Sequence, residues 1–234
     1  WAGVLGNQLI GGILGAIGGA IARIARDAGW QTTSVGRSAH PDRPDWLVYD
    51  ALRDSADCLD GAGIFDAVCW AQGANYNDSL YDFDADRHRE LYDANCLAVM
   101  ASLSALLAKR SLVGTGARLC IVSSIWQERA RTNKFSYTVT KAAVGGLVRA
   151  AAVDLGVDGH LVNGVLPGVL DTPMTRANLS ADQIARVEEK TTHRRLPDLE
   201  TLAELVLFLC SRKNRSITGE SIAVDLGMSN AQLL

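Results

Sequence analysis

Short apolar runs rich in β-branched residues alternate along this chain with longer amphipathic stretches. The alternation is typical of βαβ units that form a buried parallel sheet. The predicted strands are Val4 to Ile10, Gln31 to Val35, Trp46 to Tyr49, Phe65 to Trp70, Arg118 to Ser123, Leu161 to Val165 and Ser221 to Val224. The predicted helices begin near Ala16, Asp86, Tyr137, Asp182 and Leu199, and the longest of them runs from Asp86 to Lys109. We therefore expect an α/β fold with a doubly wound parallel sheet of about seven strands and helices on both faces.

The length and composition favour one compact domain over residues 1–234. A chain of 234 residues buries about 70% of its unfolded surface without a disulfide or metal. Its net charge of −3 excludes a broad nucleic-acid-binding face and favours a small-molecule partner. Cys69, Cys96, Cys120 and Cys210 lie in apolar or helix-like segments, which indicates reduced thiols and a cytoplasmic protein. No motif of closely spaced Cys or His suggests a metal.

The stretch from Trp1 to Ala22 carries no charge, so a signal peptide and a membrane span must be considered. It contains seven glycines together with Asn7 and Gln8, and it has no basic leading segment. We therefore expect neither, and we expect no association with a membrane.

The glycine-rich run Gly11-Gly12-Ile13-Leu14-Gly15-Ala16-Ile17-Gly18-Gly19 follows the first predicted strand and opens a predicted helix. A pyrophosphate-binding turn occurs at this place, because glycine lets phosphates approach the backbone N–H groups at a helix N-terminus. The alternative is close packing of the helix alone.

Arg37 follows the second predicted strand, at about the distance where a carboxylate would bind the adenosine ribose of NAD. A guanidinium there favours the 2′-phosphate of NADP(H) through charge-assisted hydrogen bonds. The alternative is a solvated surface arginine.

Tyr137 and Lys141 are four residues apart, so they share one face of a helix. An ammonium in that position can stabilise a phenolate. Lowering a tyrosine pKa from about 10 to near 7 requires about 4 kcal/mol of differential stabilisation. The alternative is an ordinary helix pair, with the tyrosine in the core and the lysine in water.

In these features the chain resembles the classical short-chain dehydrogenase/reductase family from about Gly11 to Gly227. The Tyr-x-x-x-Lys motif of that family matches Tyr137 and Lys141, its catalytic serine matches Ser124, and its helix asparagine matches Asn95. The resemblance implies a Rossmann-type fold and a cofactor site formed by Gly12, Leu14, Gly15, Ile17, Gly18, Arg37, Asp50, Ala51, Ala71, Gly73, Tyr137, Lys141, Pro167, Gly168, Leu170 and Thr172. In it, Asp50 would bind the adenine and Thr172 the nicotinamide carboxamide.

Three departures from the family pattern stand out. Gly11 and Ala16 replace the threonine and the middle glycine of the glycine motif, and Trp70-Ala71-Gln72-Gly73 replaces Asn-Asn-Ala-Gly. Leu14 stands where many NADP-dependent members carry a basic residue, so the NADP(H) assignment depends on Arg37.

The resemblance implies hydride transfer between the nicotinamide and a carbonyl or alcohol carbon, and NADP(H) favours reduction of a ketone or aldehyde. Tyr137 would donate the proton, and Ser124 would bind the substrate oxygen. Lys141 would lower the tyrosine pKa and bind ribose hydroxyls, and Asn95 would hold a water. Trp126, after Ser124, is a further candidate substrate contact.

Two other functions remain as alternatives. One is a catalytically silent NAD(P)-binding regulatory protein of the same fold, and the other is a cofactor-free lyase or dehalogenase. Retention of all four catalytic-type residues argues against the first, although the altered glycine turn and the lost Asn-Asn-Ala-Gly argue slightly for it. The second usually replaces the lysine and fills the dinucleotide site, and neither is seen in this sequence.

Substrate identity is not encoded in any motif. A basic group in the segment after Thr172 is compatible with an anionic substrate and equally with a solvated face: Arg176, His193, Arg194 and Arg195. Small apolar residues on two predicted helices, among them Ala101, Ala105 and Ala151, indicate a homodimer or homotetramer.

Overall fold

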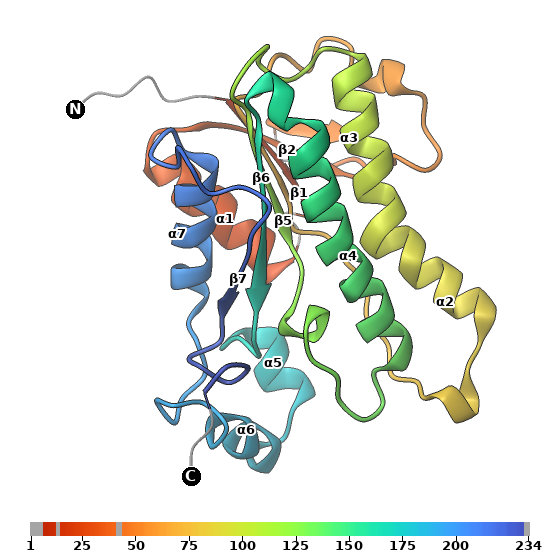
Figure 1. Ribbon diagram of the computed structural model, residues 1–234, viewed down its shortest axis with the longest axis vertical. Coiled ribbons are helices and arrows are strands. Elements are labelled where there is room, and N and C mark those ends of the chain that lie inside the picture. The colour runs from red at the N-terminus through yellow and green to blue at the C-terminus, as the bar shows by residue number, and fades with distance from the viewer. Residues whose placement is uncertain (1–6, 13–14, 41–43, 232–234) are drawn as a thin grey trace.

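The computed structural model describes residues 7–12, 15–40 and 44–231, and its centre is a seven-stranded, all-parallel sheet (Figure 1). The strand order is β3-β2-β1-β4-β5-β6-β7. The strands are β1 (Asn7–Gly11), β2 (Gln31–Gly36), β3 (Trp46–Val48), β4 (Ala67–Trp70), β5 (Arg118–Val122), β6 (Leu161–Pro167) and β7 (Ser221–Val224). The predicted doubly wound sheet is thereby confirmed.

Helices cover both faces of the sheet (Figure 1). One face packs against α1 (Ala16–Asp27) and α7 (Leu199–Cys210), and the other against α3 (Ala98–Ala108) and α4 (Phe135–Asp154). Every residue of β4 is buried, because this central strand contacts a helical layer on each side. Two apolar clusters, one per face, form the core, as expected for strands without a polar face.

The chain reverses its direction of winding between β1 and β4. β1 pairs with β2 on one side and with β4 on the other, with Gly11 opposite both Val35 and Trp70. Loops that leave two such strands diverge to opposite faces and open a crevice at the carboxyl ends, where ligands of doubly wound sheets bind.

The longest predicted helix is observed at Ala85–Ala108. It consists of α2 (Ala85–Tyr92), a π-helical segment (Asp93–Leu97) and α3. Of the described helices, it alone is long and apolar enough to meet the criteria for a membrane span, and its inward side packs in the core through Val99 and Leu103. The π-helical segment was not predicted. It is equivalent to one residue inserted into an α-helix, which changes the hydrophobic periodicity of the sequence too little to be recognised.

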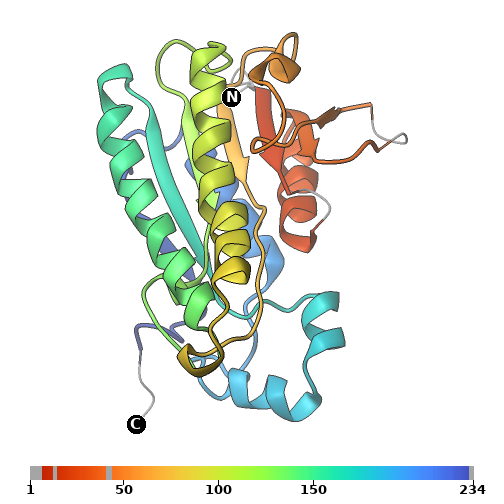
Figure 2. The ribbon, with the colours of Figure 1, turned by 90° about the vertical axis from the view of Figure 1, so that its right-hand side faces the viewer.

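Several other element boundaries differ from the sequence predictions by one or two residues, and one helix was not predicted. α4 begins at Phe135, two residues before the predicted start. A short helix α5 (Pro173–Asn178), capped by Thr172, precedes α6 (Ala181–Glu188), and six residues are too few for a visible period. The two short helices protrude from the body of the molecule beyond the carboxyl end of the sheet (Figure 2). The predicted start of the first strand, at Val4, lies outside the described residues.

Candidate active site

The helix α4 carries Tyr137 and Lys141 and is fixed at its beginning by a residue from a distant loop. Its N-cap residue, Lys134, makes no side-chain cap. The backbone N–H of Ser136 instead donates to both carboxylate oxygens of Asp78, at 3.0 and 3.3 Å. A carboxylate at a helix N-terminus interacts favourably with the helix dipole, so this contact stabilises the turn that presents the tyrosine.

Close packing brings α4 against the segment that follows Ser124. A Cβ atom at Gly145 would lie 2.9 Å from the Cδ atom of Gln127, closer than two such atoms can approach. Ser124 itself lies two residues after the end of β5 and caps a 3₁₀ turn (Ile125–Gln127), with its Oγ accepting a hydrogen bond from the Trp126 N–H at 3.3 Å. The serine and the tyrosine are therefore positioned by two elements in direct contact.

The Ser124 hydroxyl lies near enough to the Tyr137 phenol to influence its pKa. Burial raises the pKa of Tyr137 above its usual value, and the interaction with Ser124 offsets part of that rise. The lowered pKa expected from the sequence stays a prediction for the cofactor complex.

Lys141 lies beside the same ring, with its Nζ 5.6 Å from the Tyr137 ring centroid. The residue is only 4% exposed, and burial lowers the pKa of its ammonium to about 8. Within the described part of the chain this ammonium makes no hydrogen bond or ion pair. A buried cation is stabilised by polar partners. The N–H groups of the Lys141 ammonium are therefore available to donate to ribose hydroxyls.

Asn95 lies in the π-helical segment and ties the loop after β4 to α4. Its Oδ1 accepts from the Ala74 N–H at 2.8 Å, and its Nδ2 donates to the Ala74 carbonyl at 3.1 Å and to Thr140 Oγ1 at 3.0 Å. π-helical insertions often occur at functional sites. Both N–H groups of this side chain are used within the protein, and its expected water-binding role stays a prediction.

The turn after β1 fits a dinucleotide. Gly12 has a φ of +75°, and a Cβ there would lie 2.5 Å from the Gln72 backbone nitrogen. Gly15 precedes α1 without a side-chain cap, which leaves the first N–H groups of the helix free for an anion. The buried Gln72 Oε1, which faces this turn, has no hydrogen-bond partner in the structure. Ile17 and Gly18 lie in the first turn of α1, and Leu14 lies outside the described residues.

The predicted adenosine contacts lie at the carboxyl ends of β2 and β3. Arg37 directly follows β2, next to the β1 turn, and is exposed. Asp50 accepts a hydrogen bond from the Leu52 N–H at 3.0 Å, and Ala51 is half-buried in the same turn. The arginine is thus available to a ligand, whereas the carboxylate already has a local partner.

The predicted nicotinamide contacts follow β6 and β4. Pro167 ends β6, and the Gly168 N–H donates to the Val224 carbonyl at 3.0 Å, while Leu170 is buried. Thr172 Oγ1 accepts from the Thr175 N–H at 3.1 Å, which makes it the cap of α5 as well as a candidate ligand for the carboxamide.

The unusual sequence after β4 braces the sheet in its own way. Trp70 Nε1 donates to Ser102 Oγ at 2.7 Å, which ties β4 to α3. The Ala71 N–H donates to the Gly11 carbonyl at 3.1 Å, and a Cβ at Gly73 would lie 3.0 Å from Asn95 Oδ1 and 3.5 Å from Lys141 Nζ. The retained glycine therefore lies directly against two of the predicted catalytic residues.

The basic residues of the α5–α6 region are largely engaged in local contacts. Arg176 binds Asp171 through two hydrogen bonds of 2.7 Å, and Arg195 forms an ion pair with Asp198 at 3.6 Å. Arg194 donates to the Glu189 carbonyl at 3.2 Å. His193 Nδ1 is 2.9 Å from Thr192 Oγ1. These contacts remove most of the support for an anion site in this segment.

Sequence reasoning missed two buried polar residues beside the site, Lys134 and Asp78. Each lies in an irregular segment without periodicity, so no pattern marks it. The only hint for Lys134 was its position three residues before Tyr137.

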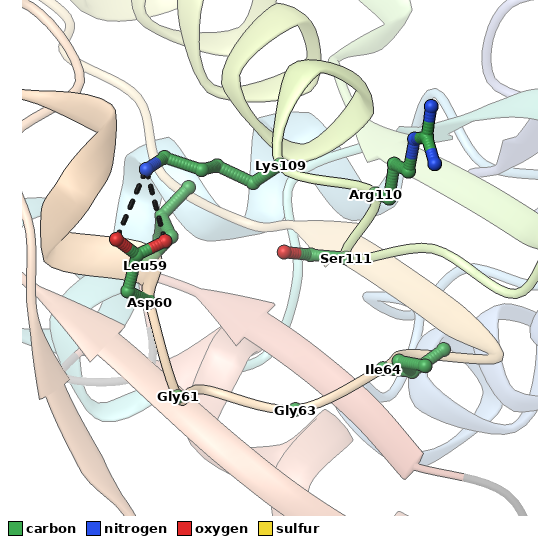
Figure 3. A pocket seen from close by; sticks show the side chains of 8 residues that line it. All are labelled: Leu59, Asp60, Gly61, Gly63, Ile64, Lys109, Arg110 and Ser111. Atoms are coloured by element: carbon green, nitrogen blue, oxygen red, sulfur yellow. Dashed lines mark hydrogen bonds and ion pairs between the residues drawn. The ribbon is translucent and has the colours of Figure 1, made fainter.

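A shallow pocket lies at the opposite end of the sheet, before β4 and after α3 (Figure 3). Lys109 enters it from α3 and forms an ion pair with Asp60 at 2.9 Å. It contains none of the predicted site residues.

A family model described as "Enoyl-(Acyl carrier protein) reductase" matches residues 49–229. The cis-4-hydroxycyclohexanecarboxylate dehydrogenase of Sinomonas cyclohexanicum is 33% identical over 207 residues, which cover 88% of this chain and 80% of the relative. The 2-keto-3-deoxy-L-fuconate dehydrogenase of Xanthomonas campestris is 30% identical over 174 residues, which cover 72% of this chain and 58% of the relative.

Among solved structures, a gluconate 5-dehydrogenase from Burkholderia cenocepacia in complex with NADP and tartrate superposes with a TM-score of 0.86. It is 24% identical, and the match covers 96% of this chain and 95% of that one. The chain belongs to the short-chain dehydrogenase/reductase family, a family of NAD(P)-dependent oxidoreductases.

Proposed function

We propose that the chain is a single-domain, NADP(H)-dependent enzyme that reduces a small ketone or aldehyde to an alcohol, and that catalyses the reverse reaction when alcohol is in excess. The observation that carries the proposal is the convergence of three side chains: Ser124 acts on the pKa of the Tyr137 phenol, and the Lys141 ammonium lies 5.6 Å from the centroid of the tyrosine ring. When bound, the nicotinamide supplies the hydride.

In this proposal the two hydroxyl groups act on the substrate oxygen. Ser124 donates a hydrogen bond to the carbonyl and stabilises the negative charge that develops on it. Tyr137 gives its proton to that oxygen. Burial raises the pKa of Tyr137, so the phenol keeps its proton until a stronger base forms beside it, which suits the direction of reduction.

Lys141 and Asn95 support the tyrosine. The Lys141 ammonium stabilises the phenolate left after proton transfer, and its N–H groups hold the ribose hydroxyls. Asn95 holds the loop that contains Gly73 against Lys141, and we propose that it also binds a water through which the tyrosine is reprotonated.

The preference for NADP(H) over NAD(H) depends on Arg37. Its exposed side chain follows β2, where the adenosine ribose would lie, and Asp50 at the end of the next strand has a local partner. We expect Arg37→Ala to weaken NADPH binding by about 10-fold or more, the scale of a charge-assisted hydrogen bond, and to leave NADH binding unchanged. Calorimetric titration of both nucleotides tests this.

The names of the two relatives support a substrate that carries a carboxylate, since one acts on a hydroxycyclohexanecarboxylate and the other on a deoxy sugar acid. Apolar side chains remain exposed on the face formed by α3 and α4, which lie side by side in Figure 2: Met100, Leu107, Val139 and Val153. They support a homodimer or homotetramer through this face. The five free cysteines support a cytoplasmic location.

The experiment that tests the function compares Tyr137→Phe with the wild type on a panel of ketones and aldehydes. We expect kcat to fall by at least about 10²-fold, the usual scale for loss of a general acid, while NADPH affinity stays within about twofold. Tyr81→Phe is the matched control, because that tyrosine is fully exposed and makes no contact with the site. Normal turnover by Tyr137→Phe would refute the assignment.

A further inference from the structure

The structure contains a buried lysine beside the candidate active site that the proposed mechanism does not use. Lys134 directly precedes α4 and is only 6% exposed. Its Nζ lies 5.5 Å from the Tyr137 ring centroid, nearly the same distance as the Lys141 Nζ. Two ammonium groups thus flank the tyrosine along the chain, one three residues before it and one four residues after it.

Both partners of the Lys134 ammonium are neutral. Its Nζ donates to Asn75 Oδ1 at 2.6 Å and to the Tyr76 carbonyl at 3.2 Å. An ammonium has three N–H groups, so one of them has no acceptor among the residues that the structure describes. These contacts orient the side chain toward the loop after β4 while its charge stays close to the tyrosine ring.

The charge of Lys134 is poorly compensated. No carboxylate in the described ranges lies within 4.0 Å of it, and Asp78, whose charge does reach it, uses its oxygens to accept from the Ser136 N–H. Burial lowers the pKa of Lys134, and the nearby positive charge of Arg131 lowers it further. Moving a cation out of water without a counter-charge costs free energy. Uncompensated buried charges therefore often occur at functional sites, where a ligand supplies the opposite charge.

Arg131 adds a second, exposed positive charge near Lys134. Its guanidinium carbon lies 5.7 Å from the ring centroid of Trp126, which lies in the 3₁₀ turn that Ser124 caps and was expected to contact substrate. Two neighbouring cations, one exposed and one buried, attract an anion toward this region.

We propose that Lys134 binds the carboxylate of the substrate, which makes the substrate class a hydroxy acid or oxo acid. This inference rests on the proposed function, since it places the reacting oxygen at Ser124 and Tyr137. A carboxylate bound about 2.8 Å from the Lys134 Nζ is separated from an oxygen held by the Tyr137 phenol by the length of a few carbon–carbon bonds. The carboxylate and the reacting carbon therefore belong to one small molecule, and Lys134 selects it over neutral ketones.

The test compares an anionic substrate with its neutral counterpart. With NADPH we would measure reduction of 4-oxocyclohexanecarboxylate and of its methyl ester by the wild type, Lys134→Met and Lys134→Gln. We expect kcat/KM for the acid to fall about 100-fold in both variants, mainly through KM, and kcat/KM for the ester to stay within about twofold. Lys134→Arg should restore about a tenth of the activity on the acid, and Lys213→Met, which removes an exposed lysine elsewhere, should change neither substrate.

Lys134→Gln also separates the two roles of the side chain. It removes the positive charge, but its amide can still donate a hydrogen bond to the loop that contains Asn75 and Tyr76. An equal loss on acid and ester would mean that Lys134 only holds the loop to α4, and it would overturn the proposal. An unchanged kcat/KM for the acid would overturn it as well.

A binding measurement keeps this inference distinct from the proposed function. Cyclohexanecarboxylate lacks the reacting oxygen, so its calorimetric titration into the NADPH-loaded protein reports the carboxylate site without turnover. We expect saturable binding to the wild type and at least tenfold weaker binding to Lys134→Gln. If this acid binds through Lys134 but no carbonyl compound is reduced, the proposed function fails, while the carboxylate site at Lys134 stands. If the wild type does not bind it, or binds it no better than the variant, the inference fails.

Discussion

Gly12 provides the sharpest test of how the cofactor crevice is built. A Cβ at this position would lie 2.5 Å from the Gln72 nitrogen and 2.7 Å from the Ala71 carbonyl carbon. Both atoms are backbone atoms, so neither can rotate away, and the φ of +75° adds strain for any residue with a side chain. A left-handed conformation costs about 1–2 kcal/mol, and overpacking costs about 1–3 kcal/mol. We therefore expect Gly12→Ala to reduce the free energy of unfolding by about 2–5 kcal/mol.

For a chain of this size each kcal/mol corresponds to about 2–4 °C in melting temperature, so Gly12→Ala should melt about 4–20 °C below the wild type without nucleotide. Gly15→Ala is the control from the same turn. Its φ is −79°, and its Cβ would meet only the Gly12 carbonyl oxygen at an ordinary 3.5 Å, so its melting temperature should stay within about 3 °C. Thermal melts followed by circular dichroism decide the matter. If both variants melt alike, the close approach of the two loops is not present in the protein.

Three further predictions concern buried polar groups. Burial lowers the pKa of Lys141 from 10.5 to about 8, so the folded state gains stability as pH rises between these values, and Lys141→Met should lose that gain in melts from pH 7 to 10. Burial also lowers the pKa of His160, whose Nδ1 accepts a hydrogen bond from the Ala117 N–H at 3.0 Å. The stability of the wild type should therefore fall as the pH drops below about 6.5. If the stability of His160→Asn falls as steeply between pH 7 and 5 as that of the wild type, this prediction is wrong. Asn95→Ala should cost about 2–4 kcal/mol in urea unfolding, through three lost hydrogen bonds, while Asn77→Ala at an exposed position should cost less than about 0.5 kcal/mol.

The architecture was predictable because its signals are repeated and local. Each buried strand carries its own apolar run, and four such runs, at β4 to β7, coincide with the observed strands to within two residues. Parallel strands then leave few topologies, since crossovers are right-handed. The proximity of Tyr137 and Lys141 could also be predicted, because residues four positions apart lie on the same face of a helix.

What could not be predicted depends on single contacts between distant segments. The π-helical segment at Asp93–Leu97 and the short helix α5 leave no period in the sequence. The cap that Asp78 supplies to Ser136 joins residues that are 58 positions apart, and the buried Lys134 contacts Asn75 and Tyr76 of the same loop. Likewise, the basic group after Thr172 could not be recognised as internally neutralised until Asp171 was placed beside Arg176.

The loop after β4 is clamped from two sides, by Asn95 at Ala74 and by Lys134 at Asn75 and Tyr76. A change in the length of that loop would displace the beginning of α4, the helix that carries Tyr137. We therefore expect insertions and deletions to be poorly tolerated in this loop. The α5–α6 segment, which protrudes beyond the sheet, has no comparable tie to α4 among the residues seen in the structure. Relatives of this chain are therefore expected to differ most in that segment, which can adapt to the rest of the substrate, while the clamped half, which includes Lys134, keeps its geometry.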